Sequence, residues 1–253
     1  MTGCWSRNGR IRGLSLNAAL LALLVSWLSI TAMQAQVQTM GSSDAAQAQT
    51  LARVTAIRDD FVRRAKSSGL ACTLPPPQME VREVSSFGTY DASTNTVATT
   101  DWALLRPAQR SPFFQMAGPG ADEEAAHAAF EETMHRSMLV HELAHWWEAC
   151  HKVKTPEHLA LFQQGVQADR ITVAYWREAE PSLPGKIAAI AQGLIDHTPS
   201  PVPDGQSVEE YFNQNHETLA PSIRPWFGAQ LYLAAYRETP PASLAQALAL
   251  LPR

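Results

Sequence analysis

The sequence predicts an α+β fold that is mainly helical and carries a small sheet, and three patterns support this prediction. Between Leu51 and Ala65, apolar residues recur at spacings of three and four, which is typical of an amphipathic helix. From Ala121 to about His151 the chain contains neither Pro nor Gly, and helix-forming residues dominate. Short strands are indicated before that segment, by the alternation of Met79, Val81 and Val84 and by residues 95–100.

Breaker residues separate these elements. The first helix is expected to end at Ser67-Ser68-Gly69, and the three prolines at 75–77 force an extended connection. A turn between the strands is expected over Tyr90-Asp91-Ala92-Ser93. Pro and Gly residues within 106–120 surround Phe113-Phe114, so this segment is expected to be a loop with exposed aromatic side chains.

Helices are expected over the rest of the chain. Thr155 and Pro156 have the residue types of an N-cap and a first helical position, and this helix should run toward Glu180 and stop before Pro181. Further helices are expected over residues 186–196, 207–218, 224–238 and 242–251.

The N-terminus has the features of a secretory signal peptide. Three arginines, the last of them Arg12, precede an uncharged apolar stretch from Leu14 to Met33, and Ala35 supplies the small residue of a cleavage site, with Ala32 as a second option. The sequence therefore predicts export, to the periplasm or the medium, with residues 1–35 removed. The alternative is an uncleaved anchor, which would make the chain a membrane-attached assembly factor. A polar segment, residues 36–50, is expected to be a flexible lead-in to one domain over 51–253.

The charge of the chain argues against nucleic-acid binding, and its cysteine content bears on whether it forms a disulfide. The 20 basic and 24 acidic residues give a net charge of −4, and loss of residues 1–35 leaves 17 basic residues and a net charge of −7. This balance excludes the basic surface that nucleic-acid binding requires. Cys72 and Cys150 remain in the mature chain, and two thiols in an exported protein favour a disulfide, with two buried thiols as the alternative.

One motif carries catalytic chemistry. His141-Glu142-Leu143-Ala144-His145 lies inside the helix expected over 121–151. Two histidines four residues apart project from one helical face, so both imidazoles can bind one Zn²⁺. Glu142 lies beside that face, where a carboxylate can act as the general base toward a zinc-activated water.

The motif resembles that of the zincin metallopeptidases, and more narrowly of the gluzincin branch. The metzincin extension is absent, because the residues that follow His145 lack its Gly and third His. The resemblance implies a zincin-like metallopeptidase domain over residues 51–253, in which a small sheet packs against the helix of the motif. It also implies a third, acidic zinc ligand on the next helix.

Asp169 is the first candidate for that third ligand. The segment Gln167-Ala168-Asp169-Arg170 looks like the ligand segment of several gluzincins, but Gly165 and Gln167 stand where those relatives place a Glu. In several relatives the matching Asp supports a ligating His instead. Gln167 and Glu178 are alternative ligands, and Glu148 and Glu157 are weaker candidates.

Two further features would serve a peptidase. The segment from Tyr90 to Trp102 is similar to the zincin strand that binds an extended peptide by adding it to a sheet edge, although an ordinary edge strand would look the same. His216 or Tyr211 could stabilise the oxyanion, as downstream residues do in many gluzincins. His135 lies six residues before His141, off the metal-binding face, and is expected on the surface or in the core.

The sequence thus favours an exported zinc-dependent hydrolase, a peptidase that acts on a peptide or protein substrate. His141, His145 and Asp169 would bind the zinc ion, and Glu142 and His216 would be catalytic. The alternative is a catalytically inactive zincin-fold protein that binds a peptide or a partner protein, and the missing Glu near Asp169 motivates it.

Overall fold

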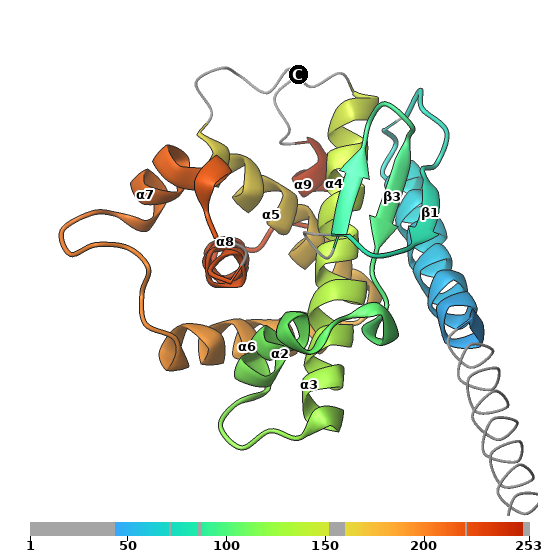
Figure 1. The fold of residues 1–253 in the computed structure, drawn as a ribbon. Coiled ribbons are helices and arrows are strands. Elements are labelled where there is room, and N and C mark those ends of the chain that lie inside the picture. The colour runs from blue at the N-terminus through green and yellow to red at the C-terminus, as the bar shows by residue number, and fades with distance from the viewer. Residues whose placement is uncertain (1–43, 71, 85–87, 152–159, 221, 250–253) are drawn as a thin grey trace, which may run out of the picture. The chain divides into compact units, whose positions relative to one another are not determined.

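A nearly continuous helical column runs through the middle of the fold (Figure 1). It consists of α3 (Glu123–Phe130), the wider π-helical η2 (Glu131–Met138) and α4 (Leu139–Cys150). The computed structural model describes residues 44–70, 72–84, 88–151, 160–220 and 222–249, and the described residues from 46 onward form one compact unit. Around the column lie further helices and one small sheet, which confirms the predicted α+β, mainly helical class.

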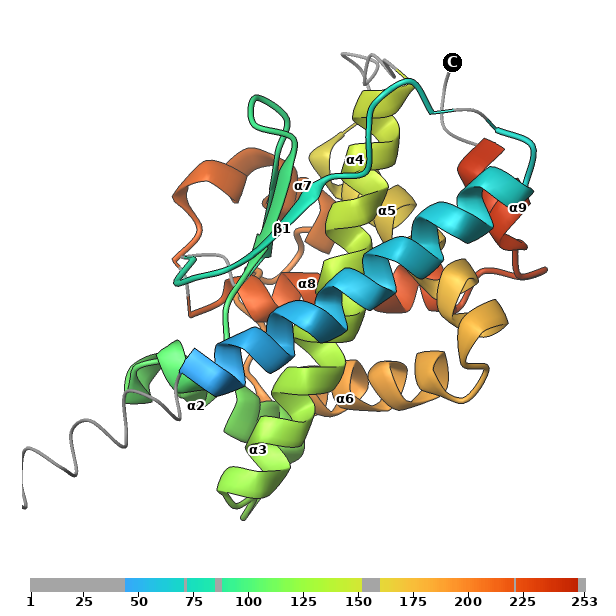
Figure 2. The ribbon, with the colours of Figure 1, turned by 90° about the vertical axis from the view of Figure 1, so that its right-hand side faces the viewer.

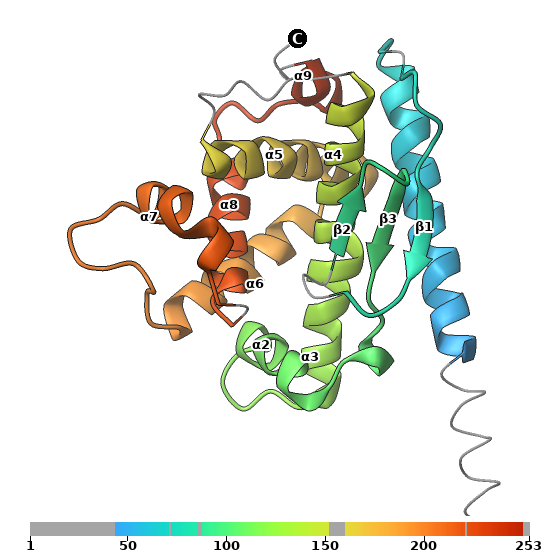
Figure 3. The same cartoon turned by 45° about the horizontal axis from the view of Figure 1, so that its top comes forward.

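The sheet has three strands in the order β1-β3-β2: β1 (Gln78–Val81), β3 (Thr96–Thr99) and β2 (Gly88–Asp91). The central strand β3 is buried throughout and pairs parallel with β1 and antiparallel with β2. The edge strand β2 lies next to α4 (Figure 3). The segment from Tyr90 to Trp102, expected to resemble a substrate-binding edge strand, thus contains the end of the edge strand β2 and the whole central strand β3, both sides of which are paired.

The turn expected over residues 90–93 was placed wrongly. Tyr90 and Asp91 belong to β2, and the turn spans residues 92–95. Two hydrogen bonds stabilise the beginning of this turn. The Asp91 carboxylate accepts both of them, from the backbone N–H of Ser93 at 2.8 Å and from the Ser93 hydroxyl at 2.6 Å. Asn95 closes it with a φ of 51°, a left-handed conformation that Asn tolerates better than most residues.

The loop expected over 106–120 is instead largely a helix, α2 (Pro107–Ala117), which follows the short η1 (Trp102–Leu104). Its breaker residues lie mostly at its ends, because Pro107 takes the first helical position, where no N–H is needed, and Gly118 ends the helix with a φ of 102°. Phe113 is not exposed. Its ring packs edge-on against Phe130 with centroids 5.0 Å apart, in a small apolar cluster.

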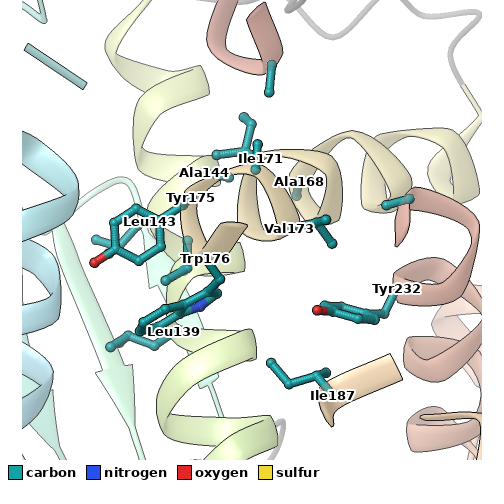
Figure 4. Packing of buried hydrophobic residues seen from close by; sticks show 14 of the residues in the cluster. Leu139, Leu143, Ala144, Ala168, Ile171, Val173, Tyr175, Trp176, Ile187 and Tyr232 are labelled. Atoms are coloured by element: carbon teal, nitrogen blue, oxygen red, sulfur yellow. The ribbon is translucent and has the colours of Figure 1, made fainter. Parts of the chain in front are cut away.

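The helices expected after residue 160 are confirmed with shifted ends. The proposed start at Thr155-Pro156 lies outside the described residues, and the helix there is described as α5 (Leu161–Ala179). Five elements follow it: α6 (Leu183–His197), α7 (Val208–Asn215), η3 (His216–Thr218), α8 (Arg224–Tyr236) and α9 (Leu244–Ala249). The main core lies where α5 crosses α4, and Figure 4 shows Trp176 of α5 beside Leu139 of α4.

The first helix covers residues 44–67, so the part of the lead-in from 44 to 50 is helical rather than flexible. The segment is rich in Ala and Gln, which form helices readily. Thr50 is the last residue of this segment, and its buried hydroxyl donates to Asp101 Oδ2 at 2.6 Å. The helix runs obliquely past the column (Figure 2), and Asp60 on it accepts a hydrogen bond from Tyr175 of α5 at 2.9 Å.

The predicted signal peptide, residues 1–35, lies outside the described residues. Within the ranges that the structure describes, no helix has the length and apolar character needed to cross a membrane.

Cys72 and Cys150 form a disulfide, with Cα atoms 5.5 Å apart. The bond joins the C-terminal end of α4 to the segment that precedes β1, across 78 residues of sequence. Replacing both cysteines by Ser should lower the free energy of unfolding by roughly 4 kcal/mol, because the unfolded chain loses a long closed loop. Urea denaturation followed by circular dichroism measures this change. Dithiothreitol should destabilise the native chain and leave the double variant unaffected. Equal stability of the native chain and the double variant in the absence of reductant would contradict the prediction.

Candidate metal centre

His141 and His145 lie one turn apart on α4 and turn the same ring atom toward each other. Their Nε2 atoms are 3.2 Å apart, and the two rings meet nearly at right angles, at 81°. His141 is largely buried, whereas His145 is about one third exposed (side chains 13% and 34% exposed). Two Nε2 atoms that converge in this way can bind the same cation at the usual zinc–nitrogen distance of about 2.0–2.1 Å.

The outer nitrogen of each ring is held by a carboxylate. His141 Nδ1 lies 2.9 Å from Asp169 Oδ1, and His145 Nδ1 lies 2.9 Å from Glu148 Oε2. In each pair the ring N–H donates to the carboxylate, which orients the ring with Nε2 toward the shared point. Zinc-binding histidines in proteins have this kind of carboxylate support. The donor set therefore fits the two-histidine part of a zinc site.

Asp169 is placed differently from the direct ligand that the sequence suggested. Its carboxylate lies on Nδ1 of His141, the ring nitrogen that faces away from the shared point. It is therefore in position to support His141, the second role that the resemblance allowed. Its neighbour Arg170 does not pair with it, because the guanidinium forms an ion pair with Glu238.

Asp169 also changes the proton affinity of His141. Burial lowers the pKa of His141, but the charge and the hydrogen bond of Asp169 outweigh burial and, with Glu142 and Glu148, raise this pKa to about 9. Without a metal, His141 is therefore protonated at neutral pH, and its Nε2–H can donate to Nε2 of His145. A cation that binds at Nε2 must displace this proton.

The described acidic residues considered as a third ligand do not complete the site, and no contact recorded for Gln167 links it to the two histidines. Among the described residues, no three His, Cys, Asp or Glu side chains are grouped so that they could hold one ion. Glu178 points elsewhere, since its Oε1 accepts from the backbone nitrogen of Leu244 at 2.9 Å. Gly165 lies against Leu231, and a Cβ there would be only 2.7 Å from Leu231 Cδ1. Glu157 lies outside the described residues.

Glu142 is buried beside the two histidines and is held by the sheet. The backbone N–H of Tyr90, on the edge strand β2, donates to Glu142 Oε2 at 2.7 Å. Only 8% of the residue is exposed. The edge of β2 thus positions the carboxylate that the motif assigns to proton transfer.

A cavity of about 280 Å³ opens beside this centre. His141, Glu142 and Asp169 line it, as does His216, which is exposed. The structure thus brings His216 to the same cavity as the motif. Tyr211, the other oxyanion candidate, does not line the cavity and stacks on Phe227 with centroids 5.9 Å apart.

Two contributions to the centre were missed from the sequence. Glu148 was considered only as a ligand, although its position three residues after His145 is compatible with a hydrogen bond along one helical face. The Tyr90 N–H has no sequence signal, because a backbone group acts independently of residue type. His135 is buried, as one of the two options for it allowed, and its Nε2 lies 2.7 Å from the carbonyl oxygen of Thr100.

Comparisons with known proteins give no match: no family model matches the chain, no curated protein matches its sequence and no solved structure matches its fold. The resemblance to zincins therefore depends on the motif and its helical setting.

Proposed function

We propose that the protein is an exported zinc-dependent hydrolase, and specifically a peptidase. One observation carries this proposal: two Nε2 atoms on one helix lie 3.2 Å apart, each imidazole is supported by a carboxylate, and the buried Glu142 adjoins them. A pair of histidines with this support is the usual way in which a helix presents ligands to zinc.

Each residue would have a defined task. When bound, zinc would activate a water molecule and polarise the scissile carbonyl group. His141 and His145 would hold the ion, while Asp169 and Glu148 keep their rings in orientation. Glu142 would take the proton from the water and pass it to the leaving amine, and the Tyr90 N–H would keep one of its carboxylate oxygens in place. His216 lines the cavity and would donate to the oxyanion.

Metal analysis and hydrolysis of a peptide library test the proposal together. Purified full-length protein should contain about one zinc per chain, lose activity on chelation and recover it when zinc returns. A matched control is His197→Ala, because His197 is exposed near the end of α6 and its Nδ1 lies 2.7 Å from the carbonyl oxygen of Gly193. This control should keep both zinc and activity. Undiminished hydrolysis by fully zinc-free protein would overturn the proposal.

A second candidate function is binding without catalysis. Leu231 packs against Gly165, the position where the resembling family has an acidic ligand, and no third protein ligand is grouped with the two histidines among the described residues. The chain would then bind peptides in the cavity and leave them intact. Stable peptide binding by the zinc-loaded protein, with no cleavage across the library, would favour this function over the first.

A further inference from the structure

Two polar side chains of α8, Tyr232 and Arg224, line the cavity beside the metal centre. Tyr232 marks the inner part, since it is buried and lines the cavity together with Asp169. Arg224, at the start of the same helix, also lines the cavity and is exposed. These two residues are separated by about 12 Å along the helix axis. The cavity therefore extends from the metal centre toward a cationic opening.

The wall between these two places is apolar and comes from several helices. Side chains of α2, η2, α6 and α8 supply it, among them Phe113, Met134, Met138, Ile187, Leu194 and Phe227. Met side chains are flexible and adapt to ligands of different shape. The lining therefore suits large apolar side chains without demanding one particular shape.

Arg224 is the charged group at the opening. Its Nε donates to the carbonyl oxygen of Leu219 at 3.2 Å. In the part of the chain that the structure describes, no carboxylate forms an ion pair with it, whereas Arg136 and Arg170 pair with Glu180 and Glu238. A guanidinium group in this state can bind a carboxylate from a ligand through two parallel hydrogen bonds. The exposed His216 lines the same cavity and adds no negative charge.

We propose that the cavity binds the apolar C-terminal residues of a peptide substrate, with the free α-carboxylate on Arg224. This inference rests on the proposed function, because it places the scissile bond at the metal centre. An extended chain spans about 3.3–3.6 Å per residue, so the distance of about 12 Å along α8 corresponds to three or four residues. The released product is therefore a tri- or tetrapeptide with apolar side chains.

The reaction is a balanced hydrolysis. Water supplies a hydroxyl to the carbonyl carbon as the C–N bond breaks, and its proton passes to the leaving amine. The products are a shortened peptide with a new carboxylate and a short peptide with a free amine. The second product keeps the carboxylate that Arg224 binds.

Binding to zinc-loaded Glu142→Gln protein tests the inference without turnover. The probes are three fluorescein-labelled peptides of equal length: one ends in Phe-Leu with a free carboxylate, one ends in Phe-Leu amide, and one ends in Ser-Asn with a free carboxylate. By fluorescence anisotropy, the first should bind at least about tenfold more tightly than either of the others. Adding Arg224→Gln should remove the difference between acid and amide, and Arg224→Lys should keep part of it.

A matched control is Arg237→Gln, which removes a guanidinium that bonds to Gln192 and does not line the cavity. It should leave the preference for the free acid unchanged, and circular dichroism should show all variants folded. Equal binding of acid and amide, or equal binding of the apolar and polar ends, overturns the inference. A preference for the apolar acid supports it even if the native protein cleaves none of the peptides, and that result contradicts only the proposed hydrolase.

Discussion

Replacing Glu142 by Gln should lower the rate of peptide hydrolysis by roughly a thousandfold and leave zinc bound. Gln can still accept the hydrogen bond from Tyr90, so the side chain stays near its place, but an amide cannot take a proton from water. Steady-state hydrolysis of the best library peptide and zinc content by mass spectrometry measure the two effects separately.

The matched control for this variant is Glu124→Gln on α3. It makes the same chemical change at an exposed position of the helical column, away from the cavity lining. Its activity should equal that of the native chain. If Glu142→Gln kept native activity, Glu142 would not be the general base.

Asp169→Asn should weaken zinc binding by about 10- to 100-fold, the usual cost of losing the carboxylate behind a zinc-binding histidine. The Asn oxygen can still accept from His141 Nδ1, but it lacks the negative charge that stabilises the ring beside a cation. Glu148→Gln should act in the same way through His145, and His141→Ala should remove zinc binding altogether. Competition with a chromophoric chelator measures each affinity.

Asp196→Asn on α6 provides the control, since Asp196 is exposed and bonds to Gln192. Its zinc affinity should be native. Asp169→Ala separates the two roles considered for Asp169: a supporting residue leaves weakened but measurable binding, whereas a direct ligand leaves none. Unchanged affinity in Asp169→Asn would contradict both roles.

The pattern of apolar residues predicted the helices better than the strands. The column that ends in α4 was predicted from the absence of Pro and Gly and from the abundance of helix-forming residues between 121 and 151. The helix α2 was mistaken for a loop, because its prolines were counted as breakers although Pro107 starts the helix. The second half of β2, Tyr90-Asp91, was mistaken for part of a turn, since Gly-Thr-Tyr-Asp has no apolar alternation and is stabilised by pairing with β3.

Some features of the centre depend on spacing within one helix and could be predicted, whereas others depend on how distant helices pack. The four-residue spacing of His141 and His145 is local, so the convergence of their rings could be predicted. Which nitrogen of His141 meets Asp169 depends on how α5 crosses α4, which no spacing within one helix determines. The contact of Leu231 with Gly165 depends likewise on the approach of α8 to α5.

The disulfide divides the residues of the centre into two groups. The Cys72–Cys150 bond closes a covalent ring that contains both histidines and Glu142, while Asp169 and the α8 wall of the cavity lie outside the ring. Such a ring persists in an oxidising compartment and is rare where thiols are kept reduced. A chain held reduced therefore presents the imidazoles on a helix whose C-terminal end has no covalent tether. Oxidation links the end of the helix that carries the histidines covalently to the segment before β1, and leaves the attachment of α5 and α8 to that helix to non-covalent packing.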